Sequence, residues 1–347
     1  MDKLARFACV ILAAACNSSS TPHNSGMGPD AGTAPPDAPA GEDDAASAHD
    51  AGSVALSRTA IVFAAALDGQ SQPDLYAVDG ASITRLTTTA GAELYPAISP
   101  DRTEIAFVRD AHLYVLDVVV GVERKIAEQV GRRREISGAA WSPDGTRMVY
   151  PYPREAYPVG EDGLDESYDT TLHFVNADGT NDIAYNEPAE SGQPPGIGTL
   201  GEPAWSSTNL IAFTVADDCP DCAGGAHYAY SHPDGSDFQV IEPTDLGSNP
   251  LYPRHDLDWS PDATQWAFTS QSYLDNGPTG PNPRVATRSV ANTEIRALTT
   301  IGASHPRYAP DGQSIAFLRA DGIYVMSATG GGEHRIVSAS GVSSLDW

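Results

Sequence analysis

The hydrophobic pattern of this chain is a series of short β-prone runs, each of which follows a similar polar turn. The turn has the sequence Ser-Pro-Asp, or Ala-Pro-Asp in one copy, with Gly after it in some copies, and an aromatic or apolar residue stands directly before it. Copies lie at 99–101, 142–145, 260–262 and 309–312, and a degenerate copy follows Trp205. Pro at the second position and Gly at the fourth suit a type I turn. The pattern therefore predicts strands separated by tight turns.

Each repeat predicts four strands. The first ends at the residue before the turn, and the second is an Ile-Ala-Phe run such as 105–107. The third is an alternating run such as 113–116, and the fourth resembles 123–126. Four strands in about 40–45 residues is the size of one β-propeller blade.

The two ends of the repeat region complement each other. Residues 60–89 contain only the last three strands of a blade, whereas 342–347 resemble a first strand, with Trp347 in the aromatic place. Pairing these segments would close the ring and leave no unpaired edge. We therefore predict an all-β, six-bladed propeller of four-stranded antiparallel blades, closed by the C-terminal strand 342–347 and the N-terminal blade 60–89.

The N-terminal region predicts export. Lys3 and Arg6 precede a short apolar run, and small residues lead up to Cys16, which resembles a bacterial lipoprotein signal. Ordinary secretory cleavage after Ala15 is the alternative. We interpret 1–15 as a lipoprotein-type signal peptide with lipidation at Cys16, 16–57 as a disordered acidic tether rich in Ala, Pro, Asp and Gly, and 58–347 as the propeller.

The net charge of -26 limits the partners. Phosphate binding needs a basic surface, so nucleic acid is excluded as a partner. Docking on anionic headgroups by charge is equally disfavoured, which leaves a lipid anchor as the only predicted membrane contact. We expect a monomer in the bacterial cell envelope, at the outer membrane or in the periplasm, or a secreted protein.

The Ser-Pro-Asp-Gly turn, the Ile-Ala-Phe run and the Leu-Tyr-Val strand together resemble the TolB-type propeller repeat, which is also called PD40 and is similar to WD40 repeats. The resemblance covers about residues 58–347 and implies a fold more than a function. TolB proper has an α/β domain before its propeller, where this chain has the predicted tether, so a Tol-system role is not implied. A Gly-x-Ser-x-Gly elbow is absent from the sequence, and a related peptidase activity is therefore not supported.

Two sets of positions should ring the central channel. The residues three places before each aromatic position are Tyr95, Gly138, Glu202, Asp256, His305 and Ser344, and those one place before are Ala97, Ala140, Ala204, Asp258, Arg307 and Asp346. The varied acids, His and Arg could bind a ligand or partner, or could simply line a water-filled channel. Long insertions should gather on the same face, which we call the loop face. The Ser-Pro-Asp turns mark the opposite turn face, where we expect only scaffold.

The longest insertion runs from 151 to 170. Tyr157 and Tyr168 are candidates for the partner face. The carboxylates of this insertion could hold Ca²⁺, and the weak candidates are Asp162, Asp165, Glu166 and Asp169. Their spacing does not match an EF-hand, so we favour a solvated acidic loop and predict no metal or other cofactor.

Cys219 and Cys222 form a Cys-x-x-Cys pair in another insertion. Outside the cytoplasm two nearby cysteines usually form a disulfide, which we expect here. Metal binding would need two further ligands, and a redox role would need a helix start; both remain alternatives.

The sequence thus favours a non-enzymatic lipoprotein that binds a protein or peptide on the loop face. One alternative is an enzyme at the channel mouth, such as a metal-dependent lyase or hydrolase acting on polysaccharide or peptide. The other alternative is a calcium-stabilised structural module. No catalytic residue is predicted, because the sequence defines no Ser–His–Asp set.

Overall fold

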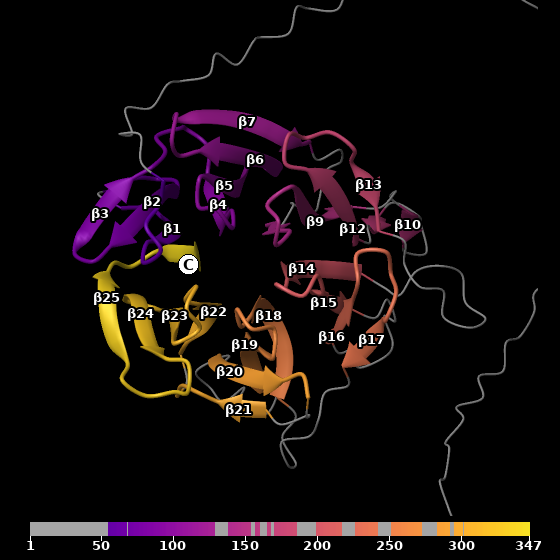
Figure 1. The fold of residues 1–347 in the computed structure, drawn as a ribbon. Helices are drawn as coiled ribbons and strands as arrows, with labels where there is room; N and C mark the ends of the chain where they lie inside the picture. The colour runs from indigo at the N-terminus through magenta and orange to yellow at the C-terminus, as the bar shows by residue number, and fades with distance from the viewer. Residues whose placement is uncertain are drawn as a thin grey trace, which may run out of the picture. The chain divides into compact units, whose positions relative to one another are not determined.

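The computed structural model describes residues 55–67, 69–128, 138–153, 157–159, 165–167, 170–185, 199–216, 226–241, 251–272, 283–291, 295–300 and 302–347. In these segments the regular structure is entirely β, and none contains a helix long and apolar enough to span a membrane. Six four-stranded antiparallel sheets surround a central channel as the blades of a propeller (Figure 1). The predicted fold class is therefore confirmed.

The blades are numbered along the chain, and their strands are given from the channel outwards. Blade 1 contains β26 (Val342–Asp346), β1 (Ile61–Ala65), β2 (Asp74–Asp79) and β3 (Ser82–Arg85); blade 2 contains β4 (Glu93–Ile98), β5 (Glu104–Arg109), β6 (His112–Asp117) and β7 (Val122–Ala127); blade 3 contains β8 (Ala140–Trp141), β9 (Arg147–Pro153), β12 (Thr170–Asn176) and β13 (Ile183–Ala184).

The second half of the ring has the same order. Blade 4 contains β14 (Thr199–Trp205), β15 (Ile211–Ala216), β16 (Ala226–Ser231) and β17 (Gln239–Ile241); blade 5 contains β18 (Leu251–Trp259), β19 (Gln265–Ser272), β20 (Arg284–Ser289) and β21 (Ile295–Ala297); blade 6 contains β22 (Ser304–Tyr308), β23 (Ser314–Arg319), β24 (Gly322–Ser327) and β25 (His334–Ser338).

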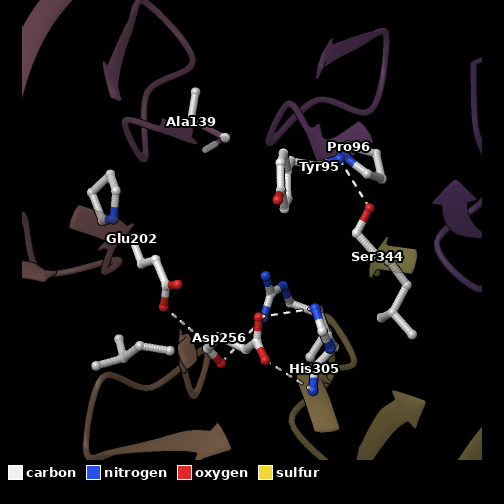
Figure 2. Close-up of a pocket in the computed structure, with 12 residues that line it drawn as sticks. Tyr95, Pro96, Ala139, Glu202, Asp256, His305 and Ser344 are labelled. Carbon is white, nitrogen blue, oxygen red and sulfur yellow. Dashed lines mark hydrogen bonds and ion pairs between the residues drawn. The ribbon is translucent and has the colours of Figure 1, made fainter. Parts of the chain in front are cut away.

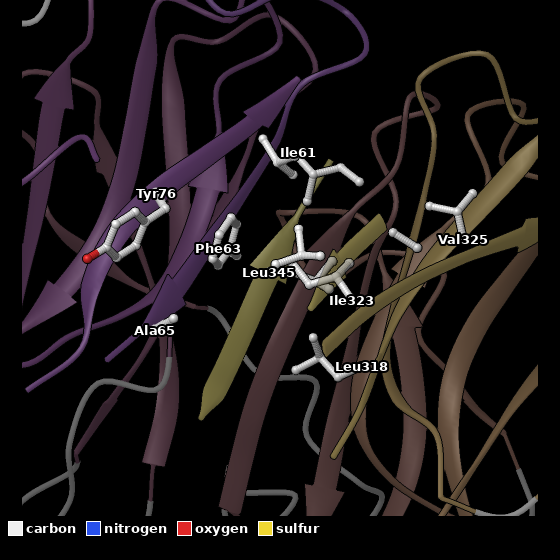
Figure 3. Close-up of a cluster of buried hydrophobic side chains, with 11 residues drawn as sticks. Ile61, Phe63, Ala65, Tyr76, Leu318, Ile323, Val325 and Leu345 are labelled. Atoms are coloured by element: carbon white, nitrogen blue, oxygen red, sulfur yellow. The ribbon is translucent and has the colours of Figure 1, made fainter. Parts of the chain in front are cut away.

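The C-terminal strand closes the ring, as predicted. β26 pairs antiparallel with β1, and Phe63 lies opposite Leu345 in the register. Leu345 is buried in a cluster that includes Ile61 from its own blade and Leu318 and Val325 from blade 6 (Figure 3). The last strand is therefore held both by its hydrogen-bond ladder and by packing between blades.

The hydrophobic core lies between neighbouring blades. The second strand of five blades places a Phe in the core with an exposed fraction of 1% or less, and these residues are Phe63, Phe107, Phe213, Phe268 and Phe317. Blade 3 has the fully buried Tyr150 instead. Both faces of these second strands are covered, which explains why the Ile-Ala-Phe runs are continuously apolar.

The recurring turn is stabilised by its own side chains. The Asp144 carboxylate accepts hydrogen bonds from the Ser142 hydroxyl at 2.6 Å and from the Thr146 backbone N–H at 3.0 Å. These bonds lower the pKa of Asp144 to about 2. Gly145 completes the turn with a φ of 69°, a value that favours glycine. Asp101 and Asp262 repeat these contacts, so the motif is a local device for reversing the chain.

The insertion of blade 3 contains a feature that the sequence pattern did not predict. β10 (Tyr157–Val159) pairs antiparallel with β11 (Asp165–Ser167), with Tyr157 opposite Ser167. The acidic segment predicted as a loop therefore includes a small β-hairpin. Its candidates Asp165 and Glu166 lie in β11.

Candidate binding site around the channel

A backbone irregularity recurs within the innermost strands, three residues before the aromatic position. The residues three places before the aromatic position, which we call the mouth positions, include four non-glycine residues in the left-handed region: Tyr95, Glu202, Asp256 and His305, with φ between 47° and 69°. The register of strand pairing shifts at each of these points. Such bulges re-aim side chains, and each left-handed residue costs on the order of 1–3 kcal/mol.

The mouth positions surround one pocket at the loop face. Figure 2 shows Tyr95, Glu202, Asp256, His305 and Ser344 arranged around it, and Arg307 also lines it. Its volume is about 60 Å³. The predicted loop-face candidates Tyr95, Glu202, Asp256, His305 and Arg307 therefore come together in space.

Hydrogen bonds between adjacent blades hold the mouth in shape. The backbone N–H of Tyr95 donates to Ser344 Oγ at 2.9 Å, and that of Asp256 donates to Glu202 Oε2 at 2.8 Å. The N–H of His305 donates to Asp256 Oδ2 at 3.3 Å. In each case a mouth side chain accepts from the mouth residue of the following blade. The left-handed backbone is therefore supported by the neighbouring blade.

Acidic and nitrogen-containing side chains meet on one side of the pocket. His305 Nε2 lies 3.2 Å from Asp256 Oδ1, and Thr269 donates its hydroxyl to the same carboxylate at 2.8 Å. Arg307 Nη1 donates to the backbone carbonyl of Asp256 at 3.3 Å. The mouth therefore presents hydrogen-bond acceptors and hydrogen-bond donors within a few ångströms of each other.

The channel wall below the mouth has two dissimilar halves. The residues one place before the aromatic position, the wall positions, are alanines in blades 2 to 4 and Asp258, Arg307 and Asp346 in blades 5, 6 and 1. Arg307 Nε lies 3.7 Å from Asp346 Oδ1. Burial raises the pKa of Asp258 to about 7 and also raises that of Asp346, while Arg307 opposes both shifts.

A larger cavity opens on the turn face. This turn-face basin has a volume of about 610 Å³, roughly ten times that of the loop-face pocket, and lies within the range of small-molecule sites. Its lining includes Arg58, Arg102, Trp205, Asp258, Trp259, Tyr308, Asp346 and Trp347, together with Pro100, Pro261 and Pro310 of the turns. The sequence pattern predicted only scaffold on the turn face and did not predict this basin. The aromatic residues before the turns were the available signal.

Several predicted residues lie outside the described part of the chain. These are Cys16, Cys219, Cys222, Tyr168, Asp162 and Asp169. Tyr157, Asp165 and Glu166 are placed only through the backbone of the β10–β11 hairpin. Within the described residues, no group of three or more His, Cys, Asp and Glu side chains is arranged to hold a metal ion.

The fold and the channel define the protein class as a six-bladed β-propeller of TolB-like architecture. Its similarity to solved structures agrees with this. TolB from Acinetobacter baumannii superposes with a TM-score of 0.57 at 17% identity, and the match covers 83% of this chain and 66% of that one. A putative TolB from Agrobacterium tumefaciens superposes with a TM-score of 0.54 at 15% identity, and the match covers 82% of this chain and 89% of that one.

Propellers with other roles have the same fold. An oligogalacturonate lyase solved with manganese matches with a TM-score of 0.53 and 19% identity over 81% of this chain and 74% of that one. A chain of a nidogen–laminin complex matches with a TM-score of 0.58 and 11% identity, and the match covers 83% of this chain and 97% of that one. No protein-family model and no curated protein sequence matches the chain. At these identities the likeness concerns the fold alone.

Proposed function

We propose that this protein is a non-enzymatic binding module of the bacterial cell envelope, whose propeller holds a protein or peptide partner on its loop face. The observation that carries the proposal is the loop-face pocket. Strained mouth residues from several blades aim polar side chains at one small hollow. Strain of this kind concentrates at functional sites, where the surrounding structure supports it.

The size of the pocket favours a macromolecular partner over a small-molecule substrate. Sites that enclose small molecules measure about 300–1,000 Å³, whereas this hollow measures about 60 Å³. It could take one side chain or a chain terminus of a partner whose remaining surface rests on the rim. The paired Asp256 and His305 and the neighbouring Glu202 offer hydrogen bonds of both kinds to such a group.

Partner binding can be tested by affinity capture from solubilised cell envelope with the purified full-length protein. The test variant combines Tyr95→Ala with Glu202→Gln, and Ile83→Ala on the outer strand β3 is the matched control. We expect a partner that the wild type and the control retain and that the double variant loses. Equal recovery by all three proteins, or no enrichment over a blank resin, would contradict the proposal.

The enzymatic alternative would give a different result. Turnover of a polysaccharide or peptide by the purified protein, abolished by Asp256→Asn, would replace the binding module with an enzyme. The fold of the oligogalacturonate lyase makes polysaccharide the first substrate class to assay.

The envelope location is part of the proposal and is supported by the sequence alone. Cys16 follows a basic start and a short apolar run, as in a lipoprotein signal. Cells that express the protein should incorporate labelled palmitate into it, and Cys16→Ser should abolish the label. Export of an unlabelled wild-type protein would favour plain secretion.

No cofactor is included in the proposal. Calcium at millimolar concentration is therefore expected to leave the melting temperature unchanged. A rise that Asp165→Asn removes would support the calcium-stabilised module instead.

A further inference from the structure

Two tryptophans from different blades line the turn-face basin. Trp205 ends the first strand of blade 4 and Trp347 follows that of blade 1, and these blades stand opposite each other in a ring of six (Figure 1). Both indoles are half-buried, so part of each ring remains accessible. Arg147 lies over the Trp205 ring at 5.5 Å, and the Trp205 indole N–H donates to Asn209 Oδ1 at 2.9 Å. The remaining accessible surface of the two indoles gives the basin lining an aromatic part.

Between these walls the basin offers acceptors and donors together. The Asp258 and Asp346 carboxylates stand on its floor, and each uses one oxygen to accept a backbone N–H from the next blade. The exposed Arg58 lies at its rim. The mixed charges disfavour a strongly anionic or a strongly cationic ligand.

Three buried polar atoms of the lining lack a hydrogen-bond partner within the described part of the chain. They are Arg102 Nε, Tyr308 Oη and Trp347 Nε1. The equivalent indoles of Trp141 and Trp259 donate to carbonyls of the preceding blade at 2.9 and 3.2 Å, so Trp347 departs from the pattern of the fold. An unmade hydrogen bond of a buried group costs about 1–3 kcal/mol, so the hydrogen bonding of the lining is incomplete at these three atoms.

We propose that the turn-face basin binds a short neutral saccharide. A sugar ring has apolar C–H faces that suit indole surfaces and a rim of hydroxyls that both donate and accept. Those hydroxyls complement the carboxylates of Asp258 and Asp346 and the guanidinium of Arg58. The volume of about 610 Å³ lies in the usual range of small-ligand sites. This site lies on the face opposite the proposed partner site, so either proposal can fail without the other.

The test is a titration of the full-length protein with N,N′-diacetylchitobiose, cellobiose and maltose, followed by intrinsic tryptophan fluorescence. We expect saturable quenching by at least one sugar, with a dissociation constant of about 1 mM or lower. Trp205→Ala and Arg58→Ala should each weaken binding by about tenfold or more. The loop-face variant Tyr95→Ala should leave the constant within about twofold of wild type.

Arg58→Ala separates lost binding from lost folding, because Arg58 is exposed and its removal leaves the core intact. A melting curve of each variant accompanies the titration. The proposal is overturned if none of the three sugars binds. It is also overturned if Arg58→Ala and Trp205→Ala bind as wild type does, or if only Tyr95→Ala loses binding.

Discussion

The carboxylate of Asp346 accepts a hydrogen bond at 2.7 Å from the backbone N–H of Ile98, so the last strand of the chain is tied to blade 2 as well as to its own blade. The same relationship joins Asp258 of blade 5 to the N–H of Tyr308 in blade 6, also at 2.7 Å. A wall side chain thus satisfies a backbone donor of the following blade. These bonds connect blades where their hydrogen-bond ladders do not reach each other.

Removal of this acceptor should destabilise the ring. Asp346→Ala leaves the Ile98 N–H without its acceptor, and we expect the free energy of unfolding to fall by about 1–3 kcal/mol. Asp346→Asn keeps an acceptor oxygen and should lose less. Urea unfolding measures both values. Identical stabilities for the Ala and Asn variants would show that the inter-blade bond contributes nothing.

The closing strand should be equally sensitive in its core position. Leu345 has an exposed fraction of 1%, and Leu345→Ala is expected to cost about 2–5 kcal/mol because it opens a cavity between blades 1 and 6. Ile83→Ala in β3 is the control, since Ile83 is 48% exposed and should change stability by about 0.5 kcal/mol or less. Similar losses for the two variants would argue against closure through β26.

Asp258 should make stability depend on pH. Its pKa is raised from 3.8 to about 7, so the folded protein binds this proton more tightly than the unfolded chain does. The stabilisation that protonated Asp258 gives the folded state is complete below pH 3.8 and is lost as pH rises to about 7. Asp258→Asn should therefore gain stability relative to wild type across that interval, as measured by urea unfolding at a series of pH values.

Asp144 supplies a control of opposite sign. Its pKa is lowered from 3.8 to about 2, so its contribution is present above pH 3.8 and is lost as pH falls to about 2. Asp144→Asn should alter the pH profile only at the acidic end. If the difference in the free energy of unfolding between Asp258→Asn and wild type stays constant from pH 4 to 7, the raised pKa of Asp258 is refuted.

Two arginines at equivalent strand ends provide a matched pair. Arg109 bridges Glu93, which is fully buried, and Glu123, whereas Arg319 pairs with the half-exposed Glu333. Both guanidinium groups also lie over a Tyr ring of the adjacent strand, so the loss of packing is similar. Arg109→Ala should cost about 3–5 kcal/mol, because it leaves Glu93 buried without its cation.

Arg319→Ala is expected to cost less, about 1 kcal/mol, because the partly exposed Glu333 carboxylate keeps its contact with water when the guanidinium is removed. Thermal unfolding of the two variants under one buffer gives the comparison. Equal destabilisation would show that burial of Glu93 does not set the strength of its ion pair.

Much of the architecture was predictable from local chemistry. Ser142, Asp144 and Gly145 satisfy one turn without help from distant residues, so each copy marks a strand boundary wherever it occurs. Trp347 could be assigned to the ring because 60–89 lacked a first strand. The mouth residues were predictable as a set for the same reason, since their spacing from the aromatic position is constant.

The turn-face basin could not be predicted in this way. Trp205 and Trp347 are 142 positions apart in the numbering, and only closure of the ring brings them into the lining of one cavity. The sequence also predicted an acidic loop where β10 and β11 pair, because each of these strands has only three residues and β11 contains no apolar residue. Pairings between distant residues depend on geometry that no local pattern specifies.

The sequence by itself determined the all-β repeat, the number of blades and the closing strand, since turn chemistry and strand periodicity act over a few residues. Only the tertiary structure decided which polar groups meet. The left-handed φ of Asp256, its pairing with His305, and the proximity of Asp258, Arg307 and Asp346 depend on how adjacent blades stand around the channel. Electrostatic and hydrogen-bond energies depend on those distances, so the chemistry of the channel appears only when the ring is closed.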